Sequence, residues 1–250
     1  MAELQRYKAV ISYDGSAFSG FQIQPNGRTI QAELEKALAK MHKSEIVKIV
    51  GSGRTDAGVH AKGQVIHFDS PLQISVEQWK KGLNALLSHE LVIMNLEKVA
   101  SNFHARFDAT EKTYVYKVYT QKTRDPFRYH YATHYPFSLN LDQIELAANY
   151  LVGTHDFTSF CSAKAEVLNK VRTIREIKLE NMRDELIFTI TGSGFLHNMV
   201  RIIVGTLLEV GSGKRNASDI LGILQGCDRQ LAGKTAPPQG LYLWKVEYNG

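Results

Sequence analysis

Hydrophobic positions recur along this chain with two different periods. Apolar residues that alternate with polar ones, or that form β-branched runs, are typical of strands, whereas apolar residues three or four positions apart are typical of helices. The first hundred residues show strand patterns at 7–13, 46–50, 63–68 and 91–99. Between the first two, helical spacing is kept by Ile30, Leu34, Ala37, Leu38 and Met41. A second helix is predicted at 75–87, where Ser75 and Gln78 fit a capping box.

The remainder of the chain repeats this order of elements. Strands are predicted at 112–120, 171–180, 185–191 and 241–248, and helices at 141–151 and 195–210 with a short one near 219–224. Asn140 and Gln143 supply the start signal of the helix at 141–151. The segment 121–138 is irregular and rich in Arg, Tyr and His, so we expect it to line a site or a subunit contact.

Both halves therefore read as β-α-β-β-α-β, the split β-α-β arrangement of ferredoxin- or RRM-like units. This predicts an α/β (α+β) protein with antiparallel sheets, in which helices cover one sheet face and the other face is available for binding. We place the halves at 1–105 and 106–250, with 121–138 as an insertion in the second half. A central cleft between them is the expected place for a site.

Composition narrows the class of protein. With 44% hydrophobic and 22% charged residues and six prolines, the chain is neither disordered nor of low complexity. No apolar run reaches a membrane span, and charges interrupt the first ten residues, so we expect a cytoplasmic protein without membrane contact. Cys161 and Cys227 lie far apart without partner spacing, which argues against zinc and a disulfide framework. The net charge of +5 has the sign that a nucleic-acid or phosphate partner requires.

The strongest chemical signal is the run GSGRTDAGVHA at 51–61, between two predicted strands. Three glycines within eight residues indicate a turn that presents a side chain rigidly at a sheet edge, and the candidates are Arg54, Asp56 and His60. Neither the phosphate-loop nor the dinucleotide-binding glycine pattern is satisfied. On the residues alone, Asp56 is equally well explained as a turn cap.

Several further motifs accompany this run along almost the whole chain. They are YDGSAFSGFQ upstream, and FHARFDATEKTYVYKVY, HDFTSF, FLHNMVRIIVGTLLEVG and APPQGLYLWKVEY downstream. With GRTDAGVHA, in this order, the chain resembles the tRNA pseudouridine synthase A (TruA) family. The resemblance implies the pseudouridine synthase fold and a homodimer that holds the anticodon arm of tRNA.

The implied reaction is the isomerisation of uridine to pseudouridine at positions 38, 39 and 40 of tRNA. The N1–C1′ bond breaks, the uracil rotates and C5 bonds to C1′, a rearrangement that needs no metal or redox cofactor. The resemblance makes Asp56 the catalytic carboxylate, and an ionised Asp can act as nucleophile or general base near neutral pH. Which of these it does is left open by the sequence.

The resemblance assigns roles to two arginines. Arg201 matches the arginine that pairs with the catalytic Asp, and an Arg within an apolar helix stretch is costly to leave unpaired. The alternative is a solvated Arg on a helix flank. Arg54 matches the residue that holds the target nucleotide out of the stack, by filling the vacated place or by binding a phosphate. A solvated surface Arg is again the alternative.

Two further residues are expected at the base. The resemblance places Tyr114 under the flipped uracil, where its ring can stack. Strand packing is the alternative for the tyrosines of this strand, and we expect it for Tyr116 or Tyr119. Leu241 matches a leucine beside the target base, although an apolar strand residue is equally expected in the core.

Other polar residues are weaker candidates for the site, and other functions are less well supported by the sequence. His60, His104 and His197 are expected to pack or to contact phosphate, and His155 and Asp156 to serve a turn or helix entry rather than a metal. A non-catalytic RNA-binding module is the alternative function, and Asp56 separates it from the synthase. A hydrolase is disfavoured because no second carboxylate lies near Asp56 in the sequence.

Overall fold

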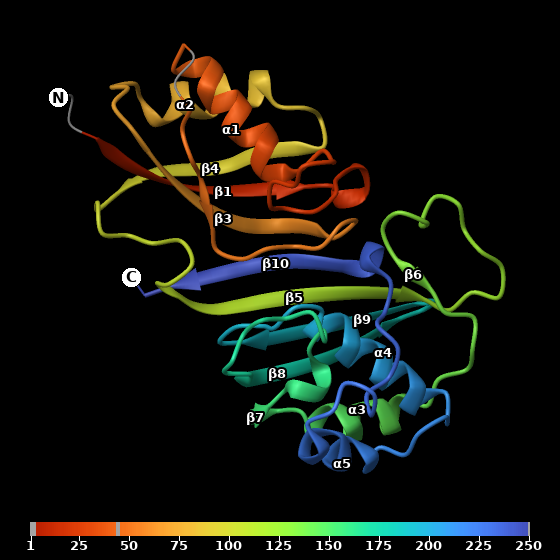
Figure 1. The fold of residues 1–250 in the computed structure, drawn as a ribbon. Helices are drawn as coiled ribbons and strands as arrows, with labels where there is room; N and C mark the ends of the chain where they lie inside the picture. The colour runs from red at the N-terminus through yellow and green to blue at the C-terminus, as the bar shows by residue number, and fades with distance from the viewer. Residues whose placement is uncertain (1–3, 44–45, 250) are drawn as a thin grey trace. The chain divides into compact units, whose positions relative to one another are not determined.

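A computed structural model describes residues 4–43 and 46–249, which form two compact units (Figure 1). The first unit is Met1–Thr110 with Tyr242–Gly250, and the second is Glu111–Leu241. The boundaries fall inside two strands, β5 (Ala109–Tyr119) and β10 (Leu241–Tyr248). The sequence-based division lies between residues 105 and 106 and assigns the last strand to the second half.

The first unit is a sheet with helices on one face. Its elements are β1 (Gln5–Tyr13), α1 (Ile30–Met41), β2 (Val50–Gly51), β3 (His60–Ser70), α2 (Val76–Leu86) and β4 (Leu91–Val99). Antiparallel pairing of β1 with β4 and β3, and of β3 with β2, gives the order β4-β1-β3-β2 of a split β-α-β unit. β10 joins β3 in parallel, with Tyr242 opposite His60. The other strand pairs of this unit are antiparallel as predicted, and this pair is the parallel exception.

The core of the first unit is aromatic. Trp79 of α2 packs on Tyr7 of β1 and Phe68 of β3, with ring centroids 5.5 Å and 5.4 Å away. The predicted capping box of α2 is confirmed, because the Gln78 amide donates to Ser75 Oγ at 3.1 Å and the Ser75 amide to Gln78 Oε1 at 2.8 Å. The helix therefore starts where the sequence signal places it.

The predicted strand at 46–50 is mostly absent. Val47 and Ile49 are buried, which explains the apolar pattern, but only Val50 and Gly51 pair with β3. The Ile49 amide donates to Glu35 Oε1 at 3.2 Å, so a helix side chain takes the place of a neighbouring strand.

The face of the first sheet opposite its helices is partly covered. Segment 100–108 crosses it, where the Ala105 amide donates to His67 Nδ1 at 3.1 Å and Arg6 Nη1 donates to the Phe103 carbonyl at 2.8 Å. Tyr248 donates to the Ala105 carbonyl at 2.7 Å. The expectation that this face is available for binding is therefore wrong around Arg6 and His67.

The second unit contains one sheet and three helices. Its elements besides β5 are β6 (Thr133–His134), α3 (Leu141–Asn149), β7 (Gly153–Asp156), β8 (Val171–Met182), β9 (Glu185–Gly192), α4 (Met199–Gly211) and α5 (Asp219–Gly226). β5, β9, β8 and β7 are neighbours in that order with antiparallel pairing, and β6 pairs with β5 in parallel. The short strands β6 and β7 carry too little pattern to be predicted. α4 starts at Met199 rather than at 195, because Asn198 before it has a left-handed φ of 63°.

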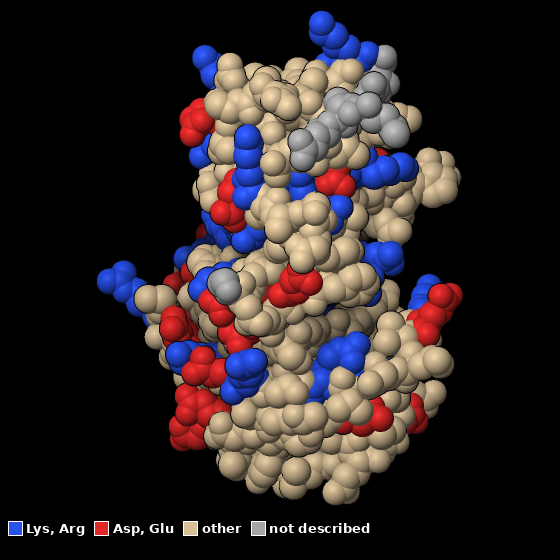
Figure 2. Space-filling view, turned by 90° about the vertical axis from the view of Figure 1, so that its left-hand side faces the viewer, with Lys and Arg blue, Asp and Glu red and all other residues tan. Residues whose placement is uncertain are grey.

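Among the described residues, the face of the molecule drawn in Figure 2 carries no broad surface of basic residues alone. On the face in view, Lys and Arg are interspersed with Asp and Glu (Figure 2). Many of them form ion pairs, such as Arg6 with Asp69 at 2.7 Å and Arg128 with Asp184 at 2.9 Å. The basic side chains that form no ion pair are therefore a better guide to a polyanionic partner than the net charge is.

Candidate active site

The loop between β2 and β3 presents two of the predicted site residues. Arg54 is exposed and Asp56 is half-buried, whereas their neighbours Ser52 and Thr55 are buried. Buried side chains thus anchor the loop, while Arg54 and Asp56 remain at least partly accessible. This is typical of loops that carry binding or catalytic residues.

Buried hydrogen bonds hold the loop on both sides of Arg54. The hydroxyls of Tyr13 and Thr55 lie 2.8 Å apart. Ser52 Oγ donates to Gln64 Oε1 at 2.6 Å, and Gln64 Nε2 donates to the Gly53 carbonyl at 2.9 Å. Burial raises the pKa of Tyr13 above its ordinary value, so its hydroxyl stays protonated. The backbone next to Asp56 is consequently fixed by neutral side chains.

The upstream motif YDGSAFSGFQ packs against this same loop. The Phe21 amide donates to the Thr55 carbonyl at 3.0 Å, and the Gly58 amide donates to the Phe18 carbonyl at 3.3 Å. Gly20 has a φ of +102°, and a Cβ there would lie 2.9 Å from the Thr55 oxygen. Two motifs that are distant in sequence therefore form one structure around Asp56.

The end of the loop is a closed turn. The Asp56 carbonyl accepts from the Val59 amide at 3.1 Å, and Gly58 has a φ of +77°. His60 follows with 2% exposure, where its Nδ1 accepts from the Gly15 amide at 3.0 Å and its ring stacks on Tyr242 at 4.7 Å. His60 thus packs, as predicted.

Tyr114 belongs to the second unit. It lies on β5 opposite Ile190 of β9, is 8% exposed and meets Phe195 edge-on at 5.0 Å. Sequence reasoning misses Phe195, although it belongs to the motif FLHNMVR and directly supports this ring.

The other tyrosines of β5 are packing residues. Tyr116 lies 2.6 Å from Thr133 Oγ1 and donates to the Pro237 carbonyl at 2.7 Å, and Tyr119 stacks on His134 at 4.8 Å. Burial raises the pKa of the Tyr116 hydroxyl, and the positive charge of Arg201 opposes this shift. The packing prediction for Tyr116 or Tyr119 holds for both.

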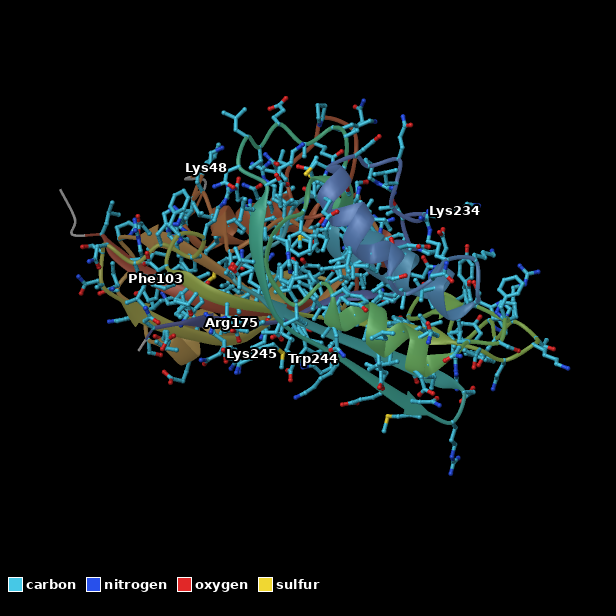
Figure 3. All side chains as sticks on the ribbon, turned by 90° about the horizontal axis from the view of Figure 1, so that it is seen from below. Lys48, Phe103, Arg175, Lys234, Trp244 and Lys245 are labelled. Atoms are coloured by element: carbon cyan, nitrogen blue, oxygen red, sulfur yellow. The ribbon has the colours of Figure 1, made fainter. Side chains whose placement is uncertain are left out.

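Arg201 is held in a defined orientation by its own unit. Its Nε donates to the Ala236 carbonyl at 2.7 Å and its Nη1 donates to Asn198 Oδ1 at 2.8 Å. The strap of residues 229–240 runs along α4 at this point, with the Lys234 amide donating to Glu209 Oε1 at 3.0 Å (Figure 3). The bonds to Ala236 and Asn198 therefore fix the orientation of the Arg201 guanidinium group, which is not merely solvated. Its predicted pairing with Asp56 of the first unit stays a prediction.

Leu241 directly follows the strap and is the first residue of β10. Its amide donates to the Pro238 carbonyl, and its side chain is 6% exposed. Burial of this degree fits a core residue as well as a contact to a base, so both predictions for Leu241 stand.

Asp156, one of the remaining polar candidates, is accounted for by local structure. Asp156 accepts from the Thr158 amide at 2.9 Å and from its hydroxyl at 2.6 Å, which confirms the predicted helix-entry role. Across residues 4–43 and 46–249, no three His, Cys, Asp or Glu side chains gather in a group that could hold a metal ion. Within the same ranges no helix is both long enough and apolar enough to cross a membrane.

Comparison with known proteins decides the family. A family model described as tRNA pseudouridine synthase matches residues 9–108 and 147–249. The chain belongs to the tRNA pseudouridine synthase family. The matched segments contain Arg54, Asp56, Arg201 and Leu241, whereas Tyr114 and the loop 121–138 lie between them.

Individual relatives agree with this assignment of a pseudouridine synthase. The chain is 54% identical to "tRNA pseudouridine synthase A 1" of Bacillus cereus over 246 residues, which is 98% of this chain and 100% of that protein. It is also 54% identical to "tRNA pseudouridine synthase A" of Geobacillus kaustophilus and of Bacillus subtilis, over 98% of this chain and 95% and 99% of theirs. An archaeal box H/ACA Nop10–Cbf5 complex aligns with 81% of the chain and 44% of that chain, at 11% identity and a TM-score of 0.36, too low to support an argument.

Proposed function

We propose that this pseudouridine synthase isomerises uridines 38, 39 and 40 in the anticodon arm of tRNA, with Asp56 as its essential carboxylate. The observation that carries the proposal is the fixed loop that presents Asp56, whose half-buried side chain directly follows residues anchored by Tyr13 and Gln64. A carboxylate held in this way approaches a nucleotide without reorganising its backbone.

The reaction balances without a further reactant. The N1–C1′ bond of uridine breaks, the uracil turns, a C5–C1′ bond forms, and the C5 proton passes to water while N1 gains a proton. Asp56 serves this sequence as nucleophile or as general base, and either role requires it to be ionised. We propose that Arg201 keeps it ionised by pairing, because the Arg201 fork is already oriented by Ala236 and Asn198.

The other site residues bind the target nucleotide in this proposal. Arg54 is exposed next to Asp56 and is available to fill the place of the flipped base or to hold a phosphate. Tyr114 offers a ring supported by Phe195 for stacking, and Leu241 an apolar side chain beside the base.

Chemical mapping of pseudouridine in unmodified tRNA transcripts tests the proposed positions. Transcripts with uridine at 38, 39 or 40 should be modified there, and replacement of that uridine by cytidine should abolish the signal. Free uracil among the products would indicate a glycosidase instead. A transcript that binds but stays unmodified would favour the non-catalytic RNA-binding module.

We also propose that the enzyme works as a homodimer in the cytoplasm. Two copies related by a two-fold axis would double the basic surface offered by one chain of net charge +5. Light scattering should give about twice the chain mass of 28.1 kDa at micromolar concentration. A particle of the single-chain mass would contradict the dimer.

A further inference from the structure

A loop in the second unit exposes aromatic side chains that the active site does not use. We name residues 121–132, between β5 and β6, the aromatic loop; it projects beyond the end of β5 (Figure 1). Phe127 is 89% exposed and Tyr129 is 62% exposed. Closely spaced, solvent-exposed aromatic side chains are unusual on a surface that binds no partner, and they are enriched at binding surfaces.

The aromatic loop is anchored and not merely extended into solvent. Asp125 Oδ1 accepts from the Phe127 amide at 2.9 Å, and the Asp125 carbonyl accepts from the Arg128 amide at 3.2 Å. Arg128 donates to Asp184 at 2.9 Å and lies over the Tyr119 ring at 5.6 Å. An anchored loop loses little conformational entropy when its aromatic side chains meet a partner.

Charge indicates the kind of partner. Asp125 is engaged by Arg128 at 3.5 Å, whereas Lys122 and Arg124 are exposed and form no hydrogen bond or ion pair with the described part of the chain. The aromatic loop thus offers two available positive charges beside the two most exposed of its rings, Phe127 and Tyr129. Exposed rings interleaved with basic side chains match unpaired nucleotides, whose bases stack and whose phosphates are anionic.

We propose that the aromatic loop binds unpaired nucleotides of the tRNA substrate, with bases on Phe127 and Tyr129 and phosphates on Lys122 and Arg124. This inference rests on the proposed function, which supplies the RNA. A second copy of the chain is a poorer occupant, because a two-fold contact of this loop with itself would bring Lys122 and Arg124 against their own copies. The loop lies between the two segments that the family model matches.

Binding of tRNA at several salt concentrations tests the inference. The variant Phe127→Ser/Tyr129→Ser should bind tRNA more weakly by at least about 5-fold for each stacked base that is lost, with an unchanged salt slope. The variant Lys122→Gln/Arg124→Gln should reduce the slope of log affinity against log salt by about 0.7 for each phosphate that is no longer neutralised. Leu221→Ser, which removes an apolar side chain that is 44% exposed on α5, should leave both quantities unchanged.

The outcomes separate this inference from the proposed function. If the unaltered chain modifies tRNA and both loop variants bind it equally well, the aromatic loop does not bind RNA. If the aromatic variant instead halves the particle mass in light scattering without changing RNA affinity, the loop is a contact between copies, which also overturns the inference. If the unaltered chain neither binds nor modifies tRNA, the proposed function itself fails. Thermal unfolding of the variants should match that of the unaltered chain, because both rings are exposed.

Discussion

The hydroxyl of Tyr13 lies 2.8 Å from the hydroxyl of Thr55, the residue directly before Asp56, and the bond between them is buried. It connects the end of β1 to the loop that presents Asp56, the proposed catalytic carboxylate. The loop's geometry therefore depends on a residue outside the glycine-rich run and far from it in the sequence.

Replacing Tyr13 by Phe should reduce both stability and turnover. The change leaves the Thr55 hydroxyl buried without this partner, which costs about 1–3 kcal/mol of the free energy of unfolding. Turnover at saturating tRNA should fall further than the lost stability explains, because Asp56 is less well positioned.

Tyr7→Phe is the matched control for Tyr13→Phe. It removes a hydroxyl from the same strand, but one whose bond to the Leu72 carbonyl is long, at 3.5 Å. Denaturant unfolding and single-turnover kinetics of the two variants should therefore differ. Equal effects would show that the bond to Thr55 has no special part in positioning the loop.

Gly20 should not tolerate a side chain. Its φ of +102° is unfavourable for other residues, and a Cβ would lie 2.9 Å from the Thr55 oxygen, so Gly20→Ala should cost about 1–3 kcal/mol and displace the loop. Gly222→Ala on α5 is the control, because its Cβ would meet nothing within 4 Å and alanine favours a helix by up to about 1 kcal/mol. Calorimetry should show a lower melting temperature for the first variant and an equal or higher one for the second. A neutral Gly20→Ala would contradict this packing.

Stability should fall as the pH drops below about 7. Burial and the positive charge of Arg6 lower the pKa of His67 to about 4, below the ordinary value of 6.5. Between these values the unfolded chain binds a proton on this residue that the folded chain does not, so stability is full above pH 7 and declines toward pH 4. At pH 5 the loss amounts to about 2 kcal/mol.

The variant His67→Asn isolates this contribution. The side-chain oxygen of the introduced asparagine would accept from the Ala105 amide in place of His67 Nδ1, but an amide does not titrate in this range. Urea unfolding at pH 7.5 and pH 5 should show a smaller difference for this variant than for the unaltered chain. His89→Asn, which removes an exposed imidazole, controls for the loss of one histidine. Equal pH differences in the unaltered chain and His67→Asn would contradict the burial argument.

The sequence predicted those features that depend on local pattern. The ranges of α1, β4 and β10 and the Ser75 cap of α2 follow from periodicity and capping, and the site loop followed from its glycines. Motifs also identified the family. In each case the signal lies within a few neighbouring residues.

Features set by long-range packing were not predictable in this way. Residues 46–49 have strand-like apolar character, but the Ile49 amide bonds to Glu35 instead of a strand, and β6 and β7 exist only because β5 and β8 pair with them. The bond of Arg201 to Ala236 likewise joins residues whose proximity is decided by the fold. The family motifs indicated which segments contribute to the proposed site. They did not predict which atoms of those segments form contacts.

The most direct test of the central claim uses tRNA carrying tritium at uracil C5, which isomerisation must release to water. The account predicts release by the unaltered chain, at least about a hundredfold less by Asp56→Asn with tRNA still bound, and near-normal release by Asp156→Asn, whose carboxylate only bonds Thr158. Tritium release by Asp56→Asn at the rate of the unaltered chain would contradict the account.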